Sequence, residues 1–289
     1  MPTRWQLLMR PTDPTRTCHV PPAQLHGLAC HLFEGTEADH HSQTKPFSIS
    51  PLVEAPRTPG RATLALGWLD DHTTPQIDTL RGEQVRLGSQ YFTLEDIQRS
   101  NAPYAALQAL PAAHRATLNF LSVTYFTRSG RWIPLPDPEL LYASLARRWN
   151  TFAPHPQRIP DPLITALLNT VRLTTHELRS APANLGPASR TGFTGHATFT
   201  LPQTAPDDLA SAFTSLSAYA EAAGTGAQTT HGLGWTTATL HPRRSTANGH
   251  SPASAPQNIG PRRETAPRRT SPSGSVSVQS VAAGKERDP

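Results

Sequence analysis

The 289-residue sequence predicts an α+β fold in which two βαββαβ units follow one another and a disordered tail ends the chain. Segments typical of strands alternate with segments whose apolar residues recur at helical spacing, and the order strand-helix-strand-strand-helix-strand occurs twice. From residue 242 onward the chain is rich in Pro, Ser and Arg and nearly lacks large apolar residues. Such a segment buries too little surface to offset its ordering entropy. We therefore predict units at 1–115 and 116–241 and a disordered tail at 242–289.

The first unit begins with the strand RWQLLMR at residues 4–10. In the segment 21–33, four apolar residues from Leu25 to Leu32 stand at i, i+3, i+4 and i+7, which predicts a helix with one apolar face. The other expected elements are strands at 46–52 and 61–69, a short helix at 75–83, and a strand or hairpin at 84–97.

The second unit begins with a strand at 117–128. Asp137 is suited to cap a helix that starts at Pro138, and this helix carries an apolar stripe that ends at Trp149. The remaining expected elements are an additional helix at 161–171, strands at 172–179 and 192–201, a helix at 205–224, and a last strand at 234–240. Both units therefore follow the ferredoxin-like (RRM-like) pattern, the second with one extra helix.

The basic character of the chain is concentrated in its tail. Residues 241–289 carry eight Arg and Lys against three acidic residues, which accounts for the whole net charge of +5. Within the rest, the segment 116–200 has a local excess of +4, so a basic surface is expected there. No apolar run is long enough to span a membrane, no signal peptide opens the chain, and two cysteines are too few for a disulfide framework. We expect a soluble, cytoplasmic protein.

The most specific motif is the loop GTGAQTTHGLG at residues 224–234, in which two Gly-x-Gly pairs precede the last strand. The loop follows a helix, and no Gly-Lys-Ser/Thr motif follows it, so it is neither a dinucleotide-binding turn nor a P-loop. Glycines allow positive φ angles and the close approach of a polynucleotide to main-chain N–H groups. The candidate RNA contacts are Gly224, Gly226, Gly232, Gly234 and His231. The alternative for His231 is that it is an ordinary loop residue without a role in RNA binding.

A resemblance to a known family is carried by the glycine loop and by four other segments: HG at 26–27, KPFSISPL at 45–52, and the segments 127–150 and 192–201. The sequence resembles the CRISPR-associated repeat-processing endoribonucleases, which belong to the repeat-associated mysterious protein superfamily. The resemblance implies cleavage of repeat RNA in a CRISPR precursor transcript, without metal or other cofactor. The RNA's own 2′-OH would attack, leaving a 2′,3′-cyclic phosphate and a 5′-OH. The resemblance also suggests association with a multi-subunit interference complex.

The same resemblance maps a catalytic histidine onto the pair His40/His41 and a basic position onto Lys45. The reaction needs a base near the 2′-OH, an acid near the leaving oxygen and a cation beside the developing charge. Histidine titrates near neutral pH, and lysine is a compact point charge. We expect His40 to act, with His41 as the substitute. A tyrosine of some family members falls on Cys30, so either the adjacent His31 supplies its function or the site works without it.

Two pairs of arginines are further candidates for RNA binding. Arg128 and Arg131 flank a Ser-Gly turn just before Trp132, and basic side chains beside an aromatic suit phosphate pairing and base stacking. Arg147 and Arg148 lie on the flank of the predicted helix. They either contact phosphate or belong to a solvated face of the helix.

The sequence predicts no metal site. Adjacent histidines such as His40 and His41 diverge, and beyond Asp39 no further ligand has useful spacing. Two alternatives to the nuclease remain at this point. One is a non-catalytic RNA-binding subunit of an effector complex on the same fold. The other is an unrelated RRM-like RNA-binding protein, which has no need for the paired-glycine loop.

Overall fold

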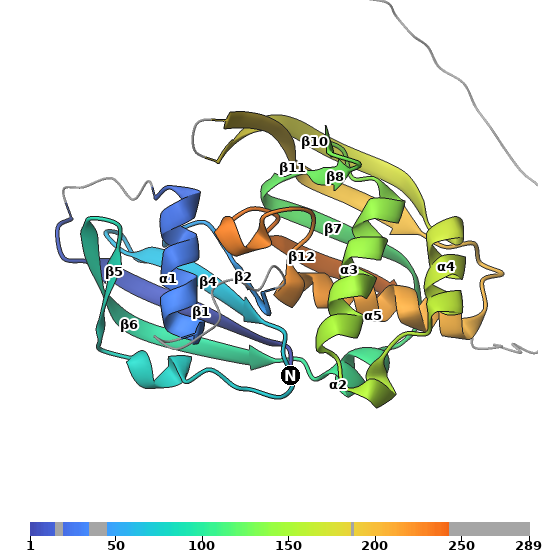
Figure 1. Ribbon diagram of the computed structural model, residues 1–289, viewed down its shortest axis with the longest axis horizontal. Coiled ribbons are helices and arrows are strands. Elements are labelled where there is room, and N and C mark those ends of the chain that lie inside the picture. The colour runs from blue at the N-terminus through green and yellow to red at the C-terminus, as the bar shows by residue number, and fades with distance from the viewer. Residues whose placement is uncertain (15–19, 35–44, 186–187, 243–289) are drawn as a thin grey trace, which may run out of the picture. The chain divides into compact units, whose positions relative to one another are not determined.

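The computed structural model of the chain describes residues 1–14, 20–34, 45–185 and 188–242 (Figure 1). The predicted tail lies outside the described residues, apart from its first position, Pro242, which ends a strand.

The first sheet is antiparallel and has the strand order β2-β4-β1-β6-β5, with the short β3 paired to β4. Its strands are β1 (Thr3–Pro11), β2 (Phe47–Ile49), β3 (Val53–Glu54), β4 (Ala62–Trp68), β5 (Gln84–Leu87) and β6 (Gln90–Asn101). Burial alternates along β1, so Trp5, Leu7 and Met9 face a core that Leu25 and Leu28 of helix α1 (Pro22–Glu34) complete. This confirms the predicted strands and the apolar face of the helix.

Two elements of this half differ from the prediction. The segment expected as a short helix at 75–83 contains only a 3-10 turn, η1 (Ile77–Leu80). The prediction did not include helix α2 (Tyr104–Gln108), which is too short for its periodicity to show in the sequence. The segment 84–97 is a hairpin, which was one of the two expected forms.

The second sheet is also antiparallel, in the order β10-β11-β7-β12. Its strands are β7 (Ala113–Thr124), β10 (Arg172–Leu185), β11 (Ala188–Thr200) and β12 (Thr236–Pro242), and its helices are α3 (Pro138–Phe152), α4 (Asp161–Thr170) and α5 (Asp207–Ala223). As predicted, Asp137 caps α3, because its Oδ1 accepts the Leu140 N–H at 3.0 Å. The fully buried Trp149 anchors this helix in the core.

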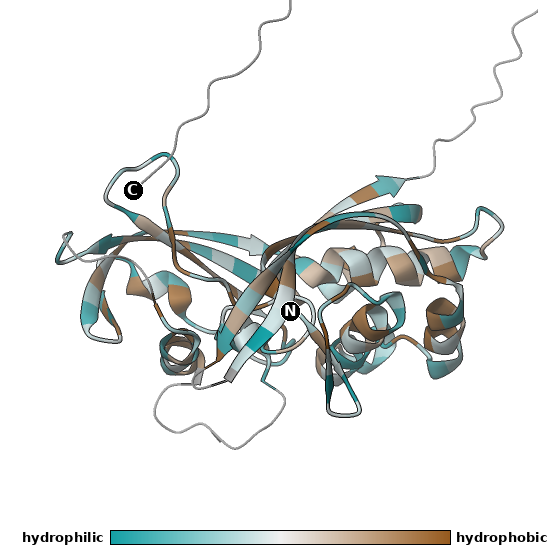
Figure 2. Ribbon diagram, turned by 90° about the horizontal axis from the view of Figure 1, so that it is seen from above, coloured by the Kyte–Doolittle hydropathy of each residue, from teal (hydrophilic) through white to brown (hydrophobic). Residues whose placement is uncertain are grey.

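In both sheets the strands lie in the order second, third, first, fourth of a βαββαβ unit, which confirms the tandem ferredoxin-like fold. Figures 1 and 2 show the helices on one side of the strands, and the opposite side carries no described helix. The first sheet lies within residues 3–101 and the second within 113–242. The domain boundary at 115 stays a prediction.

The strand predicted at 117–128 is interrupted. Strand β7 ends at Thr124, and β8 (Phe126–Arg128) pairs instead with β9 (Arg131–Ile133) in a separate two-stranded ribbon. The turn between them has φ of 51° at Ser129 and 76° at Gly130. Two successive positive φ angles match the twist of a two-residue hairpin loop, so the Ser-Gly pair determines the turn.

Hydrogen bonds connect the two halves near the end of α5. The Ser48 hydroxyl of β2 donates to the Ala222 carbonyl at 2.6 Å, and the Arg148 guanidinium of α3 donates to the Phe47 carbonyl of β2 at 3.1 Å. The Ser48 hydroxyl is fully buried, so losing its acceptor would leave an unpaired polar group. These bonds place β2 beside the loop that follows α5.

Candidate functional site

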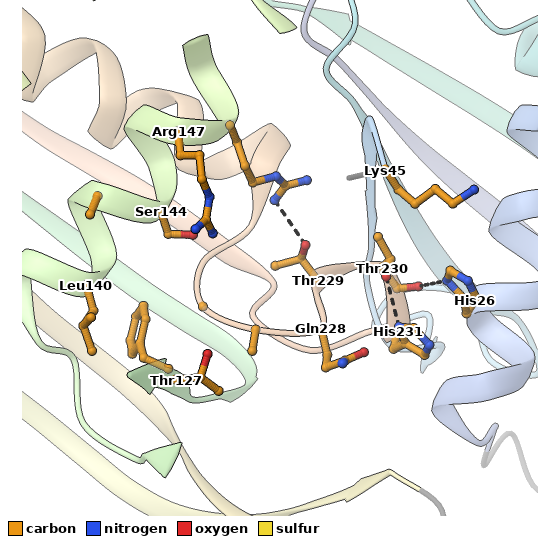
Figure 3. A pocket seen from close by; sticks show the side chains of 15 residues that line it. His26, Lys45, Thr127, Leu140, Ser144, Arg147, Gln228, Thr229, Thr230 and His231 are labelled. Carbon is orange, nitrogen blue, oxygen red and sulfur yellow. Dashed lines mark hydrogen bonds between the residues drawn. The ribbon is translucent and has the colours of Figure 1, made fainter. Parts of the chain in front are cut away.

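A cavity of about 730 Å³ lies where α1, the start of β2, α3 and the glycine loop meet (Figure 3). Fifteen residues line it, and the charged or ionisable ones among them are His26, Lys45, Arg147, Arg148 and His231. None of these fifteen described residues is acidic. The cavity therefore presents positive charge to whatever enters it.

The glycine loop adopts backbone angles that other residues rarely adopt. The φ angles at Gly224, Gly226, Gly232 and Gly234 are 67°, 77°, 85° and 67°. A Cβ atom at Gly232 would lie 2.7 Å from Cδ1 of Leu25, so the loop packs directly on α1. The Ala227 N–H donates to the Tyr125 carbonyl at 2.9 Å and ties the loop to the second half. The paired glycines are thus required by the loop's own conformation, as predicted.

Two histidines join α1 to this loop. The rings of His26 and His231 are stacked, with centroids 4.1 Å apart and planes inclined by 3°. The His26 Nδ1 lies 3.1 Å from the Thr230 carbonyl, which can only accept, so Nδ1 is the protonated nitrogen. Burial, and secondarily the neighbouring His26, lower the pKa of His231 to about 4. His231 is therefore neutral at physiological pH, so it can offer stacking and hydrogen bonding to a ligand but no positive charge.

Arg148 is half-buried and acts as an anchor of the site. Its guanidinium donates to the Ala223 carbonyl, to Oγ1 of Thr229 at 3.1 Å and to the Phe47 carbonyl at 3.1 Å. It thereby connects α3 to the end of α5, to the glycine loop and to β2. Burial lowers its pKa from the ordinary arginine value, yet the group stays charged, and it compensates the negative end of the α5 dipole. Arg147, one residue earlier, is exposed and reaches the same cavity.

Lys45 lines the cavity from the other half of the chain, just before β2. The structure thus brings Lys45, Arg147, Arg148 and the glycine loop together, although each was identified separately in the sequence. His40 and His41 lie in the segment 35–44, outside the described residues.

Six of the predicted residues that the structure describes do not line this cavity. Three of them, Gly224, Gly232 and Gly234, belong to the glycine loop, whose Gly226 and His231 do line it. The other three are His31, Arg128 and Arg131. His31 is exposed and lines a separate cavity of about 690 Å³ with Arg86 and Tyr91. Arg128 is paired with Glu139 at 2.6 Å, and this partner raises the arginine's pKa. Arg128 and Arg131 lie beside the turn of the β8–β9 ribbon, the same ribbon whose Thr127 does line the cavity.

Sequence reasoning did not identify several polar residues that line the cavity. In the sequence, His26 is marked only by the His-Gly pair, and no spacing rule identifies its stacking partner His231. Ser144 stands one helical turn before Arg147 and Arg148 on α3. This spacing places it on the same side of the helix as the arginines and could have predicted that it lies near them. The other lining polar residues are Thr127, Gln228, Thr229 and Thr230.

Two general features of the described residues concern ligands and membranes. Within the described ranges, no group of three or more His, Cys, Asp or Glu side chains is arranged to hold a metal ion. None of the described helices is both long and apolar enough to cross a membrane.

Comparison with known proteins places the chain in a family. The family described as CRISPR-associated endoribonuclease Cas6 matches residues 118–236. The CRISPR-associated endoribonuclease Cas6 of Mycobacterium tuberculosis is 35% identical over 239 residues, covering 78% of this chain and 73% of that protein.

Solved structures agree with this placement. A Cas6 product complex is similar with a TM-score of 0.69 and 27% identity, covering 83% of this chain and all of that one (100%). The Cas6 of Thermus thermophilus is similar with a TM-score of 0.63 and 26% identity, covering 83% of this chain and 98% of that chain. With its tandem ferredoxin-like fold and its paired-glycine loop, the chain belongs to the Cas6 family of CRISPR-associated endoribonucleases.

Proposed function

We propose that the cavity between α1, α3 and the glycine loop holds the scissile phosphate of CRISPR repeat RNA. The chain is an endoribonuclease of CRISPR repeat RNA by its family, and the proposal concerns where and how it cuts. One observation carries it: Lys45, Arg147, Arg148 and the glycine loop, which come from distant parts of the sequence, line one cavity.

The charge of the cavity suits a polyanion. Three side chains that are cationic at neutral pH line it, and no carboxylate is found among its fifteen described lining residues. Because Arg148 is held by three hydrogen bonds, its charge is preorganised and needs no rearrangement when RNA enters. Lys45 supplies a compact charge beside the phosphate.

The reaction we propose needs no metal ion. The 2′-oxygen of one nucleotide bonds to the adjacent phosphorus while the bond from phosphorus to the 5′-oxygen breaks. A base takes the 2′-OH proton, and an acid delivers a proton to the leaving 5′-oxygen. The products are a 2′,3′-cyclic phosphate and a 5′-OH.

We assign the proton transfer at the 2′-OH to His40, with His41 as the substitute. These residues precede Lys45 by five and four positions, so even a fully extended chain keeps their Cα atoms within about 18 Å and 14 Å of it. Either imidazole can therefore reach the cavity that Lys45 lines. His31 receives no part in the mechanism, because it lines another cavity.

A non-catalytic RNA-binding subunit is not favoured, because the Mycobacterium tuberculosis relative is itself an endoribonuclease. Family membership also excludes an unrelated RRM-like binder. We further propose that the chain acts in the cytoplasm, where it would meet a precursor transcript, and that it delivers its product to a multi-subunit interference complex.

End-labelled repeat RNA tests the mechanism. The substrate is the repeat of the CRISPR array in the same genome, incubated with the chain in EDTA. We expect one cut, a 2′,3′-cyclic phosphate on the upstream product, and no cut when the nucleotide before the scissile phosphate is 2′-deoxy. Cleavage that EDTA abolishes, or that persists with the 2′-deoxy substrate, would contradict the proposed chemistry.

A further inference from the structure

Trp132 is a large aromatic side chain left accessible beside the site. It is 44% exposed, whereas Trp5, Trp68, Trp149 and Trp235 are between 0% and 5% exposed. The chain has five tryptophans, all within the described residues, so Trp132 is the one accessible indole. Leaving part of an indole exposed forgoes some of the free energy of burying it, so the exposure calls for an explanation.

One face of this indole is covered by an arginine. The Cζ atom of Arg190, on β11, lies 3.9 Å from the ring centroid of Trp132, and one terminal guanidinium nitrogen donates to the Tyr125 hydroxyl at 3.0 Å. The Nε of Arg190 is buried and has no hydrogen-bond partner among the described residues. The guanidinium therefore stacks on Trp132 even though its Nε–H donor is left without a hydrogen bond.

The position of Trp132 relative to the cavity follows from the register of the ribbon. Trp132 on β9 is the direct partner of Thr127 on β8, and Thr127 lines the cavity. Side chains of directly opposed residues share a face and lie about 4.5–5.5 Å apart at Cβ. Successive strand residues face opposite sides, so Arg128 and Arg131 point away from this face. The cation beside the aromatic is therefore Arg190, not either of the two arginines expected from the sequence.

We propose that Trp132 is a base-stacking residue: a nucleobase of the RNA in the cavity lies on its free face while Arg190 supports the other. The occupant is RNA because the indole adjoins, through its strand partner Thr127, the cationic cavity that suits a phosphate. Stacking on an aromatic accepts any base, so Trp132 positions the strand without reading its sequence. The inference rests on the proposed function, since it places the RNA in that cavity.

Tryptophan fluorescence tests the inference on the full chain. The probe is the repeat RNA made uncleavable by one 2′-deoxy nucleotide. We expect RNA to quench wild-type emission and to protect it from acrylamide, and we expect neither change in Trp132→Phe. Trp132→Ala should raise the Kd for RNA about 5- to 150-fold, the range for loss of one stacked base. Trp132→Phe should keep most of the affinity.

A matched control and an abasic scan make the result specific. Leu135→Ala, which removes a neighbouring apolar side chain that is 59% exposed, should leave the Kd unchanged. Removing one base at a time should identify a nucleotide whose loss weakens wild type but not Trp132→Ala. Normal affinity of Trp132→Ala with an unquenched wild type would overturn the inference, and it would leave the proposed function standing if wild type still cuts. A wild-type chain that neither binds nor cuts the repeat would overturn the proposed function and the inference with it.

Discussion

The imidazole of His26 lies flat on that of His231, with 4.1 Å between ring centroids and 3° between planes. One ring belongs to the first helix and the other to the glycine loop near the end of the fold. Because His26 also bonds to the Thr230 carbonyl, the loop is held against α1 by two adjacent contacts. The shape of the cavity therefore depends on both halves of the chain.

This stack predicts a pH dependence of stability. The pKa of His231 is about 4 in the folded chain against 6.5 ordinarily, because burial disfavours its charged form. Below about pH 6.5 the unfolded chain takes up a proton that the folded chain refuses until about pH 4. The free energy of unfolding should thus fall as the pH drops through this window. Urea unfolding of wild type and His231→Gln should show a difference that grows only below pH 6.5; a constant difference from pH 7.5 to 4.5 would contradict this.

Neighbouring arginines on α3 should behave in opposite ways. Arg148→Ala removes three hydrogen bonds, two of them to carbonyls, and should lower the free energy of unfolding by about 2–3 kcal/mol. Arg147→Ala, at an exposed position, should change stability by less than about 0.5 kcal/mol. Arg147→Ala should instead reduce the slope of log K for RNA binding against log salt concentration by about 0.7, which is the change expected for the loss of one phosphate contact. Denaturation and salt titrations of both variants check this, and equal stability of the two would refute the anchoring role of Arg148.

A methyl group at Gly232 should damage the loop. Gly232→Ala adds a Cβ that would lie 2.7 Å from Leu25 at a φ of 85°, and it should destabilise the chain by about 1–3 kcal/mol. Gly60→Ala is the matched control, because φ is 70° there but no atom lies within 4 Å of the added Cβ. Thermal unfolding should show the larger loss for Gly232→Ala. Similar losses would mean that backbone strain alone, without the contact with α1, explains the requirement for glycine.

Lys45 should act on the rate of cleavage more than on binding. Lys45→Ala should slow single-turnover cleavage about 100-fold, the scale for losing one charge-stabilising group in a transition state. Lys45→Arg should restore part of the rate, because it keeps the charge but not the compact shape. Arg57→Ala, which removes an exposed cation outside this cavity, serves as the control. A rate of Lys45→Ala equal to that of Arg57→Ala would exclude Lys45 from the reaction.

Much of the fold could be predicted because its elements carry local signals. The alternation along β1, the Asp137 cap of α3 and the Ser-Gly turn are each legible within a few residues. The interruption of the strand at Tyr125 could not be predicted from the sequence. This residue continues the apolar pattern, and its burial depends on distant partners such as Arg190.

The site was predictable only in part, for a related reason. Lys45, Arg147 and the glycine loop were identified by residue type and motif, but their meeting in one cavity follows from tertiary packing. The role of Arg148 as an anchor depends on carbonyls at Phe47 and Ala223, which no spacing rule connects. The cation beside Trp132 was assigned to its sequence neighbours, because sequence proximity ignores the alternation of faces along a strand.

The most direct test of the central claim is the single-turnover cleavage rate of a His40→Ala/His41→Ala double variant, measured in EDTA with RNA binding followed in parallel. If one of these histidines transfers the proton at the cavity lined by Lys45, the rate should fall about 100- to 10,000-fold while the Kd for the repeat stays within a few-fold of wild type. Cleavage at the full wild-type rate by the double variant would contradict the account.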